Sequence, residues 1–98
     1  MTTDSGPVEK LRVLLQTMVC ELVDQPAAVV VVATPSDGRT VILTVRTASG
    51  ELGKVIGKQG RNARALRVLL EATAAKYKHR AVLEIEDEQQ GGYGCQGL

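Results

Sequence analysis

The chain has 98 residues, 44% of them hydrophobic, and a formal net charge of +1. A chain of this length forms one domain with a single modest core. Its only aromatic residues are two tyrosines, which largely excludes binding by stacking of bases on aromatic side chains. No apolar run approaches the roughly 20 residues that span a bilayer, and residues 1–5 do not resemble the start of a signal peptide, so we expect no membrane partner.

The two cysteines are too few for a disulfide framework. Cys20 falls in a predicted helix, and Cys95 falls in a glycine-rich segment near the C-terminus. We therefore expect two free thiols in a cytoplasmic protein, with a Cys20–Cys95 disulfide as the minor alternative.

Positive charge is concentrated in one part of the sequence. Residues 1–53 carry four basic and six acidic side chains, residues 54–80 carry eight basic and one acidic, and residues 81–98 carry four acidic and none basic. A basic block inside a nearly neutral domain indicates a site for a polyanion. The alternative, a solvated helix face, is weakened because such a face usually mixes charges of both signs.

The first half of the chain predicts a helix and a hairpin. Residues 8–23 have helical periodicity, with an apolar stripe of Leu11, Leu14, Leu15, Met18 and Leu22. Residues 28–34 and 40–47 are predicted strands, joined by a five-residue turn into an antiparallel hairpin. Because the first strand is almost continuously β-branched, we expect it well inside a sheet.

The second half predicts a short helix at 51–56, a loop at 57–60, a long helix at 61–77 and a third strand at 81–86. The long crossover lets the second and third strands run parallel. The expected fold is α+β, in the order α-β-β-α-α-β, with a three-stranded mixed sheet and the helices packed on one face. We expect a flexible N-terminus at 1–7, one domain at 8–86, and a disordered acidic and glycine-rich tail at 87–98.

The loop at residues 57–60, Gly-Lys-Gln-Gly, is the most informative motif and is named the GKQG loop below. Its two glycines allow a sharp turn and leave peptide N–H groups uncovered at the start of the next helix, where the macrodipole favours an anion. The positive charges of Lys58, Arg61 and Arg64 are unfavourable beside that end of the helix dipole. Their presence indicates that a bound anion offsets this cost. The spacing fits neither a P-loop nor a dinucleotide-binding fingerprint, which would need glycine at Val55.

The string Val-Ile-Gly-Lys-Gln-Gly at 55–60, followed by Arg-Asn-Ala-Arg-Ala-Leu at 61–66, resembles the VIGxxGxx(I/L) core of KH domains. The element order resembles the bacterial type II KH fold, and the resemblance covers residues 8–86. A stand-alone domain of this size is similar to the small bacterial KhpA-type RNA-binding proteins.

This resemblance implies a loop that clamps the backbone of single-stranded RNA, or of single-stranded DNA, beside an apolar groove that accepts the bases. The implied binding residues are Lys54, Val55, Ile56, Gly57, Lys58, Gln59, Gly60, Arg61 and Arg64. The implied groove walls are Val55, Ile56, Ala63 and Leu66, with residues 82–85 as the neighbouring strand. The acidic residues that follow, from Glu84 onward, are expected to repel nucleic acid at the end of the groove.

The expected function is RNA binding as a chaperone or post-transcriptional regulator. The resemblance implies a homodimer, or a heterodimer with a larger KhpB-like protein, and pairing would strengthen a weak single surface. The alternative is a KH-shaped scaffold that dimerises without binding RNA. The two glycines and the basic residues of the GKQG loop disfavour this alternative. His79 is the single histidine, and we see no acid–base pair, so we expect no enzyme, no metal and no cofactor.

Overall fold

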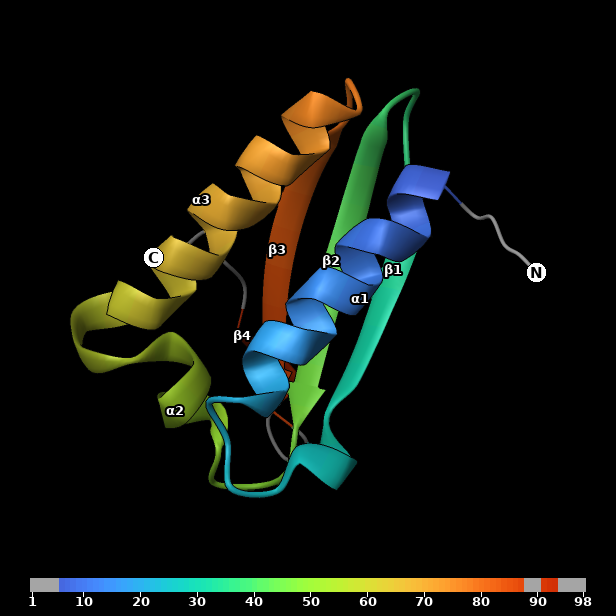
Figure 1. Ribbon diagram of the computed structural model, residues 1–98. Helices are drawn as coiled ribbons and strands as arrows, with labels where there is room; N and C mark the ends of the chain where they lie inside the picture. The colour runs from blue at the N-terminus through green and yellow to red at the C-terminus, as the bar shows by residue number, and fades with distance from the viewer. Residues whose placement is uncertain (1–5, 88–90, 94–98) are drawn as a thin grey trace.

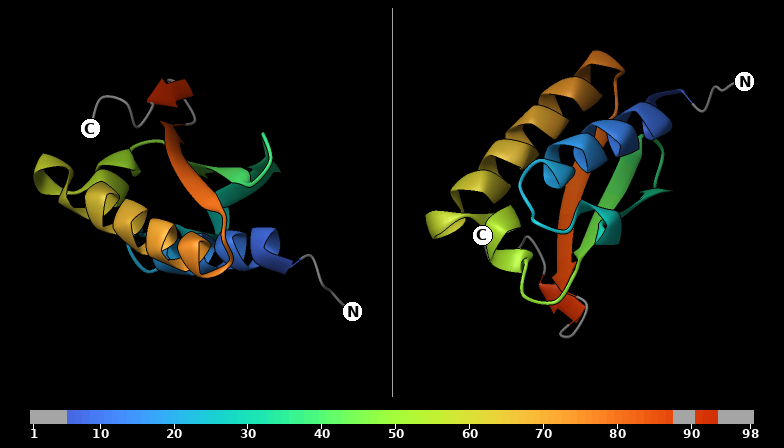
Figure 2. Two further views of the ribbon diagram at one scale, coloured as in Figure 1. Left: turned by 90° about the horizontal axis from the view of Figure 1, so that it is seen from above. Right: turned by 60° about the horizontal axis from the view of Figure 1, so that its bottom comes forward.

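The computed structural model describes residues 6–87 and 91–93. Two helices, α1 (Gly6–Cys20) and α3 (Arg61–Lys76), cover one face of a sheet, as Figures 1 and 2 show. The sheet contains β1 (Val30–Pro35), β2 (Thr40–Thr47), β3 (Arg80–Asp87) and β4 (Gly91–Tyr93). The short helix α2 (Leu52–Ile56) lies at one end of the molecule, and short 3-10 turns occupy Pro26–Ala28 and Lys58–Gly60.

The three long strands form the predicted mixed sheet. β1 and β2 are antiparallel, and β2 and β3 are parallel over eight pairs, from Thr40↔Arg80 to Thr47↔Asp87. This topology confirms the α+β class, the type II KH element order and the parallel crossover. A parallel pair needs a long connection, and here α2 and α3 provide it.

The short strand β4 was not predicted. Gly91–Tyr93 pairs antiparallel with Ile85, Glu86 and Asp87 of β3, within the segment for which the sequence predicted a disordered tail. Backbone pairing at a sheet edge needs no apolar alternation, so a Gly-Gly-Tyr run carries no strand pattern. Residues 88–90 and 94–98 of the predicted tail, and 1–5 of the predicted flexible N-terminus, lie outside the described residues.

The core is aliphatic, as expected from the composition. Its strand side consists of alternate residues that face the helices, among them Val41, Leu43, Val45, Leu83 and Ile85. Its helix side comes from residues at helical spacing: Leu11, Leu15 and Val19 of α1, and Ala63, Leu66, Leu70 and Ala74 of α3. Burial of these side chains removes apolar surface from water, and it holds the helices against the sheet.

The predicted apolar stripe of the first helix lies partly at the margin of the core. Leu14 and Met18 of α1, and Leu22 just after it, are half-buried and pack against the core, because the row through Leu15 and Val19 faces the sheet. Two adjacent apolar rows satisfy the same helical period, so the pattern alone does not choose between them.

β1 is an edge strand rather than an inner one, with Val30 and Val32 about half exposed (49% and 50%). Its β-branched run reflects strand propensity, whereas only one face of the strand is covered. Within the described part of the chain, no helix is long and apolar enough to cross a membrane.

Candidate nucleic-acid interface

The GKQG loop begins where α2 ends. Gly57 has φ 79° and ψ 170°, and its N–H donates to the Gly53 carbonyl at 2.8 Å. A Cβ built on Gly57 would lie 2.7 Å from Cγ and 2.8 Å from the backbone nitrogen of Asn62. Both the torsion angle and the lack of space therefore require glycine at this position.

The tip of the loop is a tight turn with left-handed backbone. Gln59 has φ 58° and Gly60 has φ 76°, and the Gly60 N–H donates to the Gly57 carbonyl at 3.1 Å. A left-handed conformation costs a non-glycine residue such as Gln59 about 1–2 kcal/mol, and strain of this kind concentrates at functional sites.

The peptide N–H groups of Lys58 and Gln59 are the important feature of this tip. These residues open a 3-10 turn, so neither N–H has a partner within the turn. No hydrogen bond from either N–H to a carbonyl elsewhere is found among residues 6–87 and 91–93. Helix α3 begins at Arg61, two residues after Gln59. The two donors therefore lie beside the positive end of a 16-residue helix. This arrangement suits an anionic oxygen.

The cations around the loop are of two kinds. Lys58, Arg61 and Arg64 are exposed, and no ion pair to any of them occurs within the described ranges. Lys54 differs, because its ammonium lies 3.5 Å from a carboxylate oxygen of Asp24. Three of the four predicted cations are thus available to a ligand, and the fourth would have to exchange its partner.

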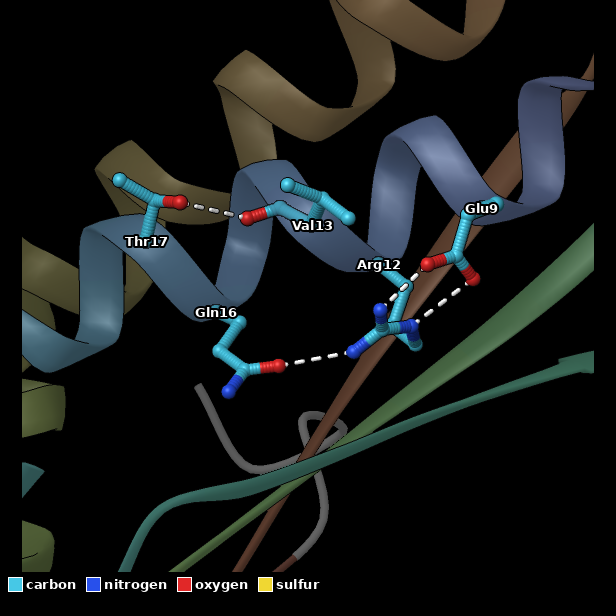
Figure 3. Close-up of polar contacts among 5 residues, drawn as sticks. All are labelled: Glu9, Arg12, Val13, Gln16 and Thr17. Carbon is cyan, nitrogen blue, oxygen red and sulfur yellow. Dashed lines mark hydrogen bonds and ion pairs between the residues drawn. The ribbon is translucent and has the colours of Figure 1, made fainter. Parts of the chain in front are cut away.

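Arg12 on α1 shows what a structurally engaged cation looks like (Figure 3). Its guanidinium donates to the carboxylate of Glu9 and, at 2.8 Å, to the side-chain carbonyl of Gln16. The hydrogen bond from Arg12 lowers the pKa of Glu9, and the same bond raises the pKa of Arg12. Arg46 is likewise paired with Glu86, at 3.0 Å across β2 and β3. Among residues 6–87 and 91–93, Lys58, Arg61 and Arg64 have no such ion pair.

The structure closes part of the predicted apolar groove. Val55 and Ala63 are fully buried in the core and form no open wall. Leu66, at 4% exposure, lines a mainly apolar hollow between α1 and α3, together with Met18 and Ala65. Val55 instead anchors the five-residue helix α2 to the core, which a helix this short requires. Ile56 remains as the half-buried apolar side chain beside the loop.

The predicted strand wall is divided between the two faces of the sheet. Leu83 and Ile85 are buried beneath the helices, and the alternation of a strand directs Val82 and Glu84 to the opposite face. Residues 82–85 therefore do not present a continuous apolar wall.

Sequence reasoning missed two residues that shape the site. The Glu51 carboxylate, only 5% exposed, accepts hydrogen bonds from the backbone nitrogens of Asp24 (2.8 Å) and Gln25 (3.4 Å), which ties the α1–β1 connection to the start of α2. The Asn62 side chain donates to the Lys54 carbonyl at 2.9 Å. A polar residue near a helix start was the only signal for Asn62, and the partners of Glu51 are distant in sequence.

Comparison with known proteins gives the family. The family model described as "KhpA/KhpB, KH domain" matches residues 12–85. This chain belongs to the KhpA/KhpB KH-domain family. The family match confirms the resemblance inferred from the sequence around the GKQG loop.

Several KhpA proteins are similar to it over most of their length. RNA-binding protein KhpA of Treponema pallidum is 53% identical over 66 residues, which are 67% of this chain and 81% of that protein. RNA-binding protein KhpA of Aquifex aeolicus is 45% identical over 75 residues (76% and 94%), and that of Clostridium acetobutylicum is 41% identical over 75 residues (76% and 99%). No solved structure matches the chain.

Proposed function

We propose that this member of the KhpA/KhpB family is an RNA-binding protein that holds single-stranded RNA by the backbone of its GKQG loop. The observation that carries the proposal is the pair of unused N–H groups on Lys58 and Gln59, beside the positive end of α3. The names of its relatives as RNA-binding proteins support the same conclusion.

Binding at this site takes place without chemical change. A phosphate oxygen accepts hydrogen bonds from the two loop N–H groups, and Arg61 and Arg64 neutralise the adjacent phosphates. Ile56 offers a small aliphatic surface to a base in place of an aromatic platform. Because these contacts are mainly to the backbone of the nucleic acid, they hold a strand with little preference for its sequence. Single-stranded DNA would share the phosphate contacts.

This mode of binding suits an RNA chaperone or post-transcriptional regulator of the cytoplasm. The loop and the start of α3 present three exposed cations, Lys58, Arg61 and Arg64, and these contact few phosphates. A single domain therefore binds weakly, and the expected Kd is micromolar. Two joined domains raise the effective concentration of the second site and strengthen binding without new contacts.

We propose that such pairing occurs with a second copy or with a larger KhpB-like protein, as the family description suggests. Two exposed apolar surfaces support it: Val68 and Leu69 on α3 (55% and 51% exposed), and Val30 and Val32 on β1. Sedimentation of the full chain, with Val68→Ser/Leu69→Ser compared with Val30→Thr/Val32→Thr, identifies the surface. If neither variant shifts the mass of an observed dimer, both surfaces are excluded.

A scaffold that dimerises without binding RNA is the competing function, and the loop disfavours it. Such a domain has no need of a strained Gln59 or of N–H groups without acceptors. Nothing in the described residues favours it over RNA binding.

The test measures binding of a fluorescent single-stranded RNA to the full chain. Lys58→Asp/Gln59→Asp places two carboxylates at the loop tip, and we expect affinity to fall by at least about tenfold. The matched control, Lys10→Asp/Gln16→Asp on α1, makes the same change in net charge away from the loop. If both variants lost affinity equally, or neither did, the loop would not be the binding site.

A further inference from the structure

Asn62 connects the two helices that flank the GKQG loop. It is the second residue of α3, and its side-chain amide donates to the carbonyl of Lys54 in α2 at 2.9 Å. The Lys54 carbonyl is among the last four of its helix, which lack partners within an isolated helix. A side chain of the second helix therefore completes the end of the first.

The same side chain limits the space of the loop. Its Cγ and Nδ2 lie 2.7 and 2.9 Å from the position of a Cβ on Gly57, so the Gly57 backbone packs directly against the Asn62 amide. Asn62 thus lies in the first turn of α3, where the loop ends, and contacts the loop at Gly57, where the loop begins.

The loop itself has little else to hold its shape. Gly57, Gln59 and Gly60 all have positive φ, and glycine has the largest conformational freedom of any residue. Three backbone hydrogen bonds involve the loop: from the Gly57 N–H to the Gly53 carbonyl, from the Gly60 N–H to the Gly57 carbonyl, and from the Arg61 N–H to the Lys58 carbonyl. None of them uses the N–H groups of Lys58 and Gln59 as donors. A loop of this kind would lose entropy on binding unless something ordered it beforehand.

We propose that Asn62 is a positioning residue for the clamp, which locks the end of α2 against the start of α3 and preshapes the loop before RNA binds. This inference rests on the proposed function of the loop, although its effect on loop shape is independent of RNA. Asn62 acts through the N–H groups of Lys58 and Gln59, and its side-chain amide donates to the Lys54 carbonyl.

The test compares Asn62→Ala with Thr73→Ala. Thr73 is a matched control because its hydroxyl also donates to a backbone carbonyl, that of Leu69 at 2.9 Å, on the same helix. In the protein without RNA, we expect Asn62→Ala to broaden or shift the NMR amide signals of Lys58 and Gln59, and Thr73→Ala to leave them unchanged. RNA affinity should fall about 5–10-fold in Asn62→Ala, the equivalent of one hydrogen bond, with the same salt dependence as wild type.

A second measurement separates positioning from direct contact. In the Lys58→Asp/Gln59→Asp background, Asn62→Ala should cause no further loss of affinity, because the groups that it positions no longer bind. A full additional loss there, or a reduced salt dependence in Asn62→Ala alone, would mean that Asn62 contacts the RNA and would overturn the proposal.

Asn62→Asp covers the case in which the alanine variant fails to fold. It keeps the side-chain shape and removes the donor, and an acid in the first turn is favoured by the helix dipole. Its loop amides should change as in the alanine variant. Unchanged loop amides in a folded Asn62 variant would refute the positioning role. Failure of the wild type to bind RNA would refute the proposed function and leave the loop measurement valid.

Discussion

The turn at residues 36–39, between β1 and β2, and the GKQG loop contain similar residues and use them differently. In the turn, the Ser36 N–H donates to the Thr40 carbonyl (2.7 Å) and the Thr40 N–H to the Asp37 carbonyl (3.0 Å). Arg39 is engaged as well: its carbonyl accepts from the Arg80 N–H at 2.8 Å, and its guanidinium donates to the Lys78 carbonyl at 3.3 Å. The glycine of this turn, Gly38, has φ +52° and open space around it.

The GKQG loop leaves the corresponding groups unused. In the described part of the chain, the N–H groups of Lys58 and Gln59 have no acceptor, and the charges of Lys58 and Arg61 have no ion pair. Gly57, by contrast, packs tightly against Asn62. In the sequence, each segment is a short turn that contains glycine and one basic residue. The hydrogen-bond pattern distinguishes them, because the turn at 36–39 satisfies its own polar groups and the GKQG loop leaves two N–H donors for the proposed ligand.

The largest difference between the two segments should appear when their glycines are replaced. Gly57→Ala forces a Cβ against Asn62 in a backbone region that glycine alone adopts, and it should cost about 3 kcal/mol of unfolding free energy. Gly38→Ala needs only a left-handed alanine in open space, at about 1 kcal/mol. Urea unfolding measures both. Equal costs would show that the packing against Asn62 does not constrain the loop.

Removing a cation should lower RNA affinity at the GKQG loop and leave it unchanged at the turn of residues 36–39. Lys58→Ala and Arg61→Ala should each weaken binding several-fold and lower the slope of log affinity against log salt by about 1, because each removes one phosphate contact. Arg39→Ala should change neither quantity, since Arg39 donates within the fold. A salt series of RNA affinities provides the measurement. The contrast between the segments would be lost if Arg39→Ala reduced the slope as much as Lys58→Ala.

The smallest effect is expected at Arg12, a paired cation on α1. Its hydrogen bond lowers the pKa of Glu9 in the folded protein, so the pair stabilises the fold above the ordinary pKa of a glutamate. This contribution is lost as the pH falls through the lowered pKa. Glu9→Gln should therefore reduce the melting temperature slightly at pH 7, have less effect at pH 3, and leave RNA affinity unchanged. A marked gain in RNA affinity would assign Arg12 to the binding surface, because the substitution releases its guanidinium from Glu9.

The local patterns that decide the fold were readable in the sequence. The bounds of β2 match the predicted ones, and the helix starting at Arg61 follows from its periodicity and from the loop before it. The order of elements then left few topologies, because a long helical crossover makes β2 and β3 parallel. Burial was less predictable: Val30 and Val32 have the same residue type as the buried Val31, and only the arrangement of the helices exposes them.

The candidate site likewise has features that the sequence predicts and contacts that it does not. The two glycines and the basic residues of the loop are visible as a motif, because their backbone and charge requirements are local. The burial of Val55, the Asp24 partner of Lys54 and the contact of Asn62 with the Lys54 carbonyl depend on segments brought together by folding. Contacts of this kind have no short-range sequence signal, so the residues that support the loop were missed while the loop itself was found.

The most direct test of RNA binding by the GKQG loop is an NMR titration of the full chain with a short single-stranded RNA. The amide signals of Lys58 and Gln59, whose N–H groups lack acceptors in the free protein, should show the largest shifts. The amides of residues 36–39 should remain in place. RNA binding that left the signals of Lys58 and Gln59 unchanged, with the largest shifts elsewhere, would contradict the account.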